Sequence, residues 1–149
     1  MSKRTIVAVV LALTIVMLAA GCAKKFEVRL EDGGAPLTGA QAERLAATTD
    51  ISALSSVTTT EAVAMRVKVL GELRTRGALG TRAADLLTIG FPARTAAVPV
   101  LVRASKVDGV DAVVVVEAFG SSGGGTLVHR RLWVFDQASG AILRAASVR

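Results

Sequence analysis

The 149-residue sequence is poor in the side chains that most often carry catalysis, metal binding and base stacking. It contains one cysteine, one histidine, four phenylalanines, one tryptophan and no tyrosine. A single cysteine excludes a disulfide within the chain, and one cysteine with one histidine falls short of the usual ligand set of a zinc site. So few aromatic residues also argue against stacking platforms for bases. We therefore expect no metal site, no cofactor and no nucleic-acid partner.

The same scarcity narrows the options for catalysis. Any imidazole base must be His129, and the sequence pattern places neither a serine nor a carboxylate beside it. The glycine-rich segment Ser121–Gly125 is followed by a β-rich run and has no lysine nearby, which is typical of a hairpin loop and not of a phosphate-binding loop. We expect no catalytic residue and no enzymatic activity. A hydrolase that uses His129 stays open as an alternative.

The beginning of the chain has the layout of an export signal. Lys3 and Arg4 precede the apolar run Ile6–Ala20, which only Thr14 interrupts. A cationic start, an apolar run of this length and small residues at its end are typical of a signal peptide. The run is also shorter than the ~20 apolar residues that span a membrane. This disfavours the alternative, an uncleaved transmembrane anchor.

The leader ends in Leu-Ala-Ala-Gly-Cys, residues 18–22, which resembles the lipobox of bacterial lipoproteins. The resemblance covers residues 1–22 only. It implies that a diacylglycerol is attached to the sulfur of Cys22 and that the chain is cleaved just before this residue. The protein would then be held by its lipid on the extracytoplasmic side of the cell membrane, or at the outer membrane if the source is a diderm.

This resemblance also divides the chain. Residues 1–21 would be the signal peptide, 22–25 the lipidated N-terminus with a short tether, and 26–149 a single domain with 31–57 as a candidate flexible segment. Without Lys3 and Arg4, 16 basic and 12 acidic residues remain, a net charge of +4. The mature chain is therefore only modestly basic.

The pattern of the remaining chain predicts an α+β fold. Residues 26–30 alternate apolar and polar, as a half-buried strand does. Capping boxes at Thr38 and Thr58 predict helices that run to about Ala47 and to Arg76, separated by a loop over 48–60 and with Gly77 as a stop. A brief third helix is expected over 82–89. Four β-rich runs follow: Val98–Lys106, Asp111–Phe119, Thr126–Phe135 and Ala141–Val148. We expect an amphipathic helix, plus short helices, packed on a four-stranded antiparallel β-meander.

The turns between these runs predict a register. A two-residue Asp-Gly turn at 108–109 sets Val102 opposite Val115, and a loop over 120–125 sets Val115 opposite Arg130. The last loop sets Trp133 opposite Arg144. One face is then the apolar core beneath the helix: Val98, Val100, Val102, Ala104, Val113, Val115, Phe119, Val128, Leu132, Val134, Leu143 and Ala145. Glu117 and Arg130 are its polar exceptions and are expected to pair near an edge.

The opposite face of the predicted sheet is half apolar, cationic and free of acidic residues. It carries the candidate partner-binding residues Arg103, Arg131, Arg144, Trp133 and His129. Exposed apolar area rimmed by charge often marks a partner surface, although long arginine stems over a tryptophan are also ordinary on a solvated sheet. The interpretation is a membrane-anchored, non-catalytic binding or assembly module. Its partner would be an anionic component of the envelope or an envelope protein.

A second function stays open, the carriage of an apolar ligand or lipid. Its pocket would open between the amphipathic helix and the sheet. The unbroken valine run at 113–116 fits the wall of such a pocket, and it fits a dry core equally well.

Mass spectrometry of the purified full-length product tests the lipidation. We expect an N-terminal peptide that begins at Cys22 and carries a diacylglyceryl group on the sulfur. An unmodified Cys22 thiol, with the leader retained or trimmed elsewhere, would contradict the proposed anchor.

Overall fold

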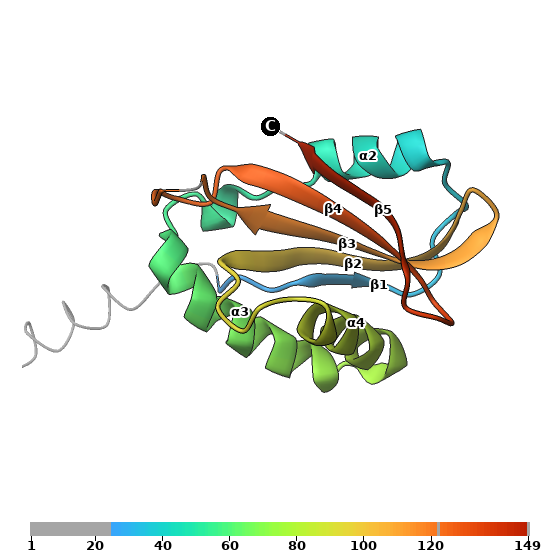
Figure 1. Cartoon of the computed structure of the whole chain (residues 1–149), viewed down its shortest axis with the longest axis horizontal. Helices are drawn as coiled ribbons and strands as arrows, with labels where there is room; N and C mark the ends of the chain where they lie inside the picture. Colours follow the sequence, from blue (N-terminus) through green and yellow to red (C-terminus); the bar gives the residue numbers. More distant parts are fainter. Residues whose placement is uncertain (1–24, 122, 149) are drawn as a thin grey trace, which may run out of the picture.

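The fold is built on a five-stranded sheet with helices on both faces (Figure 1). The computed structural model describes residues 25–121 and 123–148, so the predicted leader and Cys22 lie outside the described residues. The strands are β1 (Arg29–Glu31), β2 (Ala97–Val107), β3 (Val110–Phe119), β4 (His129–Asp136) and β5 (Ile142–Val148). The helices are α2 (Gly39–Thr48), α3 (Thr59–Arg74) and α4 (Gly77–Ile89), with a 3₁₀ turn, η1 (Ser52–Leu54). The α+β class is as predicted.

The sheet is mixed, and this corrects the prediction of a four-stranded antiparallel meander. Its order is β1-β2-β3-β4-β5, and β1 pairs in parallel with β2, with Leu30 opposite Val102. The alternation in residues 26–30 predicted a strand there, of which only Arg29 and Leu30 fall in β1, and it carried no information about the partner of that strand. Because β1 and β2 are parallel, both strands begin at the same end of the sheet.

Two helices begin where the capping boxes predicted. The Thr38 backbone N–H donates to Gln41 Oε1 (2.7 Å), and the Thr58 N–H donates to a carboxylate oxygen of Glu61 (2.9 Å). This backbone bond, with a second from the Thr58 hydroxyl, holds the pKa of the Glu61 carboxyl below its ordinary value. The helix ends were predicted less well: α3 stops at Arg74, and α4 begins at Gly77, where φ is +80°, five residues before its predicted start at 82.

The register between β2 and β3 is as predicted, with Val102 opposite Val115, but the next register is wrong. Val115 lies opposite Trp133 and not opposite Arg130, a shift of three residues. Because successive side chains point to opposite faces, an odd shift turns over every side chain of β4.

The cause of the shift is a competing partner for the end of the loop. The Thr59 N–H donates to the carbonyl of Gly125 (3.0 Å), and the Leu127 N–H donates to the carbonyl of Val57 (3.1 Å). Residues 125–127 therefore pair with the segment that leads into α3. They cannot extend the hairpin, so β4 begins at His129 and not at the predicted Thr126.

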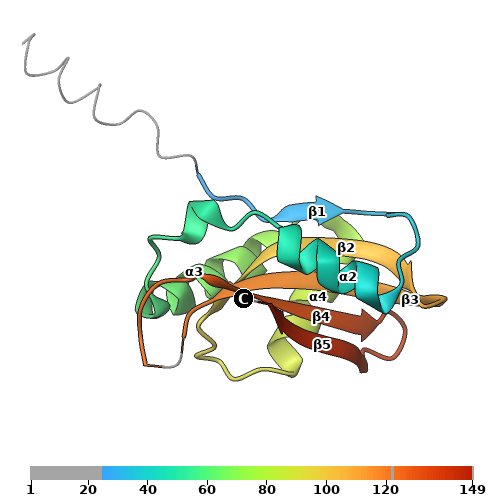
Figure 2. The same ribbon diagram turned by 90° about the horizontal axis from the view of Figure 1, so that it is seen from above.

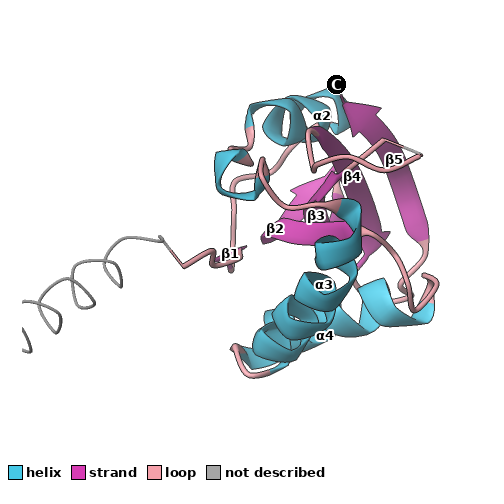
Figure 3. Cartoon of the chain, turned by 90° about the vertical axis from the view of Figure 1, so that its left-hand side faces the viewer, coloured by secondary structure: helices cyan, strands magenta, loops and turns pink. Residues whose placement is uncertain are grey.

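Both faces of the sheet are covered, which overturns the prediction of one solvated face. Helix α2 packs over β4 and β5 on one side, and α3 and α4 pack on the other (Figures 1 and 3). Strand β3 is accordingly buried from Ala112 to Ala118. A strand covered on both faces gives a continuous apolar run, which is the pattern of its valines. Of the predicted core, Val128 and Leu143 are half exposed, at 50% and 46%.

The contact between α3 and α4 depends on a glycine. A Cβ at Gly80 would lie 2.2 Å from the backbone oxygen of Leu73, whereas a Cβ at Gly71 would have no neighbour within 4 Å. We expect Gly80→Ala to lower the free energy of unfolding by roughly 1–3 kcal/mol through overpacking. The matched Gly71→Ala change should raise it by up to about 1 kcal/mol through helix propensity. Urea unfolding of both variants measures this, and equal stabilities would contradict the close packing of the two helices.

Candidate functional site

The structure divides the five candidate partner-binding residues between the two faces of the sheet. Arg103 and Arg144 lie on the face that α2 covers. Arg144 Nη1 donates to Glu43 Oε1 on α2 (2.6 Å), and Arg103 Nη2 donates to the carbonyl of Ala35 (3.3 Å). These arginines hold the segment around α2 to the sheet. Their expected place in one exposed cationic surface is therefore wrong.

Arg131, Trp133 and His129 stay together, on the face that α3 and α4 cover. Their partners on β3 are Glu117, Val115 and Phe119 respectively. Trp133 lies opposite Ala145 on β5 and not opposite Arg144, so the expected contact between Trp133 and Arg144 is also wrong. Three of the five predicted residues are thus brought together.

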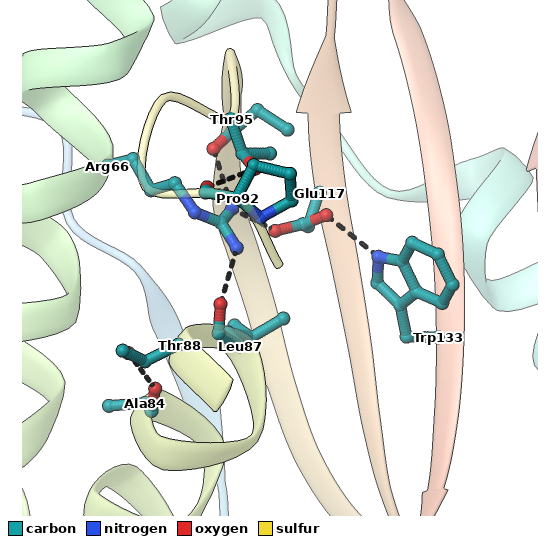
Figure 4. Close-up of polar contacts among 9 residues, drawn as sticks. Arg66, Ala84, Leu87, Thr88, Pro92, Thr95, Glu117 and Trp133 are labelled. Carbon is teal, nitrogen blue, oxygen red and sulfur yellow. Dashed lines mark hydrogen bonds and ion pairs between the residues drawn. The ribbon is translucent and has the colours of Figure 1, made fainter. Parts of the chain in front are cut away.

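A buried ion pair lies next to Trp133 (Figure 4). Arg66 on α3 and Glu117 on β3 are 3% and 0% exposed, and Arg66 Nη1 bonds Glu117 Oε1 directly. The same guanidinium donates to the carbonyls of Ala97 (2.8 Å) and Leu87 (3.1 Å), and Trp133 Nε1 donates to the other carboxylate oxygen of Glu117 (2.8 Å). The network therefore joins α3, α4, β2, β3 and β4.

Arg66 was not predicted from the sequence, and the predicted partner of Glu117 was wrong. Arg66 lies on the buried stripe of α3, four residues after Ala62 and three before Val69, and this position was the available signal. Glu117 does not pair with Arg130 as expected, because the shifted register places Arg130 on the α2 face. There Arg130 Nε donates to the carbonyl of Thr49 (2.7 Å).

An open cleft of about 690 Å³ lies beside this network, where α3 begins, β2 begins and the β3–β4 loop turns. The residues that define it are Thr59, Thr95, Phe119, Ser121, His129 and Arg131. The guanidinium of Arg131 lies 4.4 Å above the centre of the Phe119 ring and 5.6 Å from that of Trp133. Among the described residues, no carboxylate lies within 4.0 Å of this guanidinium. The cleft therefore presents a cation that aromatic rings hold in place.

His129 and Ser121 form a polar pair in the same cleft. The Ser121 Oγ and His129 Nε2 atoms are 3.0 Å apart, within hydrogen-bond distance, and the imidazole also packs against Phe119 with ring centres 5.5 Å apart. The expectation that no serine lies beside His129 is therefore wrong. In the described part of the chain, no carboxylate bonds this imidazole, so the orienting third member of a triad is not among these residues.

A smaller apolar groove of about 220 Å³ lies between α3 and α4. Val67, Leu70, Leu87 and Phe91 line it, and Val67 is 65% exposed. The apolar pocket considered from the sequence was instead expected between the amphipathic helix and the sheet. At that interface lie the Arg66–Glu117 pair and the T-shaped contact of Phe91 with Trp133, whose ring centres are 4.9 Å apart.

Neither a metal site nor a membrane-spanning helix is found among the described residues. Within residues 25–121 and 123–148, no group of three or more histidine, cysteine, aspartate or glutamate side chains is arranged to hold a metal ion. In the same part of the chain, no helix has both the length and the apolar character needed to cross a bilayer. Comparison of the chain with protein-family models, curated proteins and solved structures found no match.

The buried ion pair makes a strong prediction about stability. Glu117→Leu or Arg66→Met leaves one charge buried without its partner and should lower the free energy of unfolding by roughly 3–5 kcal/mol. The double variant Arg66→Met/Glu117→Leu should lose far less than the sum of the single changes. Asp111→Asn, which breaks the exposed pair with Lys106 (2.7 Å), is the control and should cost less than about 1 kcal/mol. Urea unfolding measures all four, and additive losses in the double variant would contradict the coupling.

Proposed function

We propose that this protein is a membrane-anchored, non-catalytic binding module of the cell envelope and that its cleft binds an anionic group. The single observation that carries this proposal is the arginine in the cleft. The Arg131 guanidinium lies over Phe119 at 4.4 Å, in an open space of about 690 Å³, with no carboxylate partner among the described residues. The anchor itself rests on the lipobox-like residues 18–22, which lie outside the described structure.

The chemistry of the cleft favours phosphate over other ligands. A guanidinium offers a planar pair of N–H donors that matches two phosphate oxygens, and stacking on an aromatic ring fixes its orientation. Ser121 and His129 add a hydroxyl and an imidazole beside it. The lining residues include no aspartate or glutamate, so no fixed negative charge in the lining opposes an anion.

Binding is a better-supported role for this cleft than hydrolysis. A serine nucleophile needs a histidine base that a third group holds in the right orientation. Among the described residues, His129 bonds Ser121 but no carboxylate. The pair therefore has the donors and acceptors that a bound polar group requires, without the complete arrangement of a catalytic triad.

The apolar groove between α3 and α4 supports the alternative of a lipid or apolar-ligand carrier less well. Its volume is about 220 Å³, smaller than the roughly 300–1,000 Å³ usual for small-molecule sites. The cleft at Arg131 is within that range. We therefore assign the binding function to the cleft.

Titration of the full-length protein in neutral detergent with glycerol phosphate tests the proposal. Arg131→Gln should weaken binding about 10- to 100-fold, because a hydrogen bond to a charged group contributes roughly 1.5–3 kcal/mol. Arg44→Gln is the matched control: it makes the same charge change at an exposed position of α2, on the other face of the sheet, and should leave the affinity unchanged. Equal affinities of the wild type and Arg131→Gln, measured by calorimetry, would overturn the assignment of the cleft.

A further inference from the structure

We infer that the anionic group is the phosphate of a phospholipid headgroup in the membrane to which the protein is anchored. This inference rests on the proposed function, and it names the ligand source. It depends on where the cleft lies relative to the beginning of the domain. The sheet topology establishes this relation.

The cleft and the beginning of the domain lie at the same end of the sheet. Strand β1 runs parallel to β2, so both begin at one end. Ala97, the first residue of β2, pairs with Phe119, which in turn pairs with His129. Figures 1 and 2 show the chain reaching β1 at the same end of the sheet as the loop between β3 and β4. A tether at the N-terminus would therefore pull on the end of the domain that carries the cleft.

The tether is short compared with the domain. Val28, only 1% exposed, is fixed in the core, and its carbonyl accepts a bond from Arg76 Nη1 (2.6 Å). Five residues lie between Cys22 and Val28, so even a fully extended chain of six Cα–Cα steps spans only about 20 Å. The 11 residues of β2 extend over roughly 36 Å from that end. A lipid on Cys22 therefore keeps the cleft end within reach of the headgroups.

The charge inside the cleft suits an anionic headgroup. Among the described residues that line the cleft, Arg131 is the one arginine, and no lysine, aspartate or glutamate accompanies it. Glu61 lies at the same end of the sheet, but its carboxylate bonds Thr58 and does not line the cleft. The opposite end carries Asp108, Asp136 and the ion pair of Asp111 with Lys106 (2.7 Å). An anionic headgroup is therefore attracted to the cleft, whose lining holds a cation and no carboxylate.

A phosphate ester is the shared chemistry of a lipid headgroup and of soluble glycerol phosphate, so the experiment must separate the two sources. Trp133 is the only tryptophan of the chain, and its ring centre lies 5.6 Å from the Arg131 guanidinium. Its fluorescence therefore reports on the surroundings of one ring beside Arg131.

The test uses the full-length lipidated protein reconstituted in phosphatidylglycerol vesicles that contain a phospholipid with a nitroxide on its headgroup. The ratio of unquenched to quenched Trp133 fluorescence is compared for the wild type, Arg131→Gln and the control Arg44→Gln. We expect at least threefold stronger quenching in the wild type and the control than in Arg131→Gln, and saturating glycerol phosphate should reduce the quenching in the wild type. Arg131→Lys, which keeps the charge, should fall between the two.

Equal quenching in the wild type and Arg131→Gln would overturn the lipid assignment. If Arg131→Gln nevertheless weakens the binding of glycerol phosphate in detergent, the proposed function survives. A soluble or polymeric phosphate then becomes the ligand. If both measurements are insensitive to Arg131, the lipid inference and the assignment of the cleft fail together. Thermal melting by circular dichroism verifies that each variant is folded.

Discussion

The buried ion pair between Arg66 and Glu117 is the interaction on which the rest of the structure depends. Both side chains are almost fully excluded from solvent, and isolation of either charge in the core would be costly. Their remaining polar atoms meet two backbone carbonyls and the Trp133 indole. Helices α3 and α4 and strands β2, β3 and β4 must all be correctly placed before these bonds form together. The pair therefore specifies how the α3–α4 layer sits on the sheet.

The same network favours the register that builds the cleft. Trp133 reaches Glu117 only when the two residues lie on one face, and in that register Arg131 is directly opposite Glu117. Arg131 is then carried over Phe119, next to His129. In the register predicted from loop length, Trp133 and Arg131 would lie on the opposite face from Glu117. The buried charge and the exposed site are thus consequences of one alignment of β3 and β4.

This dependence explains what the sequence could and could not predict. Capping boxes and an Asp-Gly turn act over a few residues, so the starts of α2 and α3 and the β2–β3 register were predicted from local pattern. The β3–β4 register depends on residues 125–127 pairing with 57–59, which are far away in sequence. The parallel pairing of β1 with β2 and the packing of α2 on β4 and β5 likewise join segments that are far apart in the sequence. For the candidate site, the pattern placed Arg131, His129 and Trp133 on one face, but it could not separate them from Arg103 and Arg144 or bring Ser121 to His129.

Hydrogen exchange of the single indole N–H, followed by nuclear magnetic resonance, tests the central claim most directly. The Trp133 N–H donates to a carboxylate oxygen of Glu117, a residue with no solvent exposure. If the network holds the helices to the sheet, this proton should exchange only through global unfolding, with the same free energy as the slowest backbone amides of β3. Exchange at the rate of a solvent-exposed indole would contradict the account.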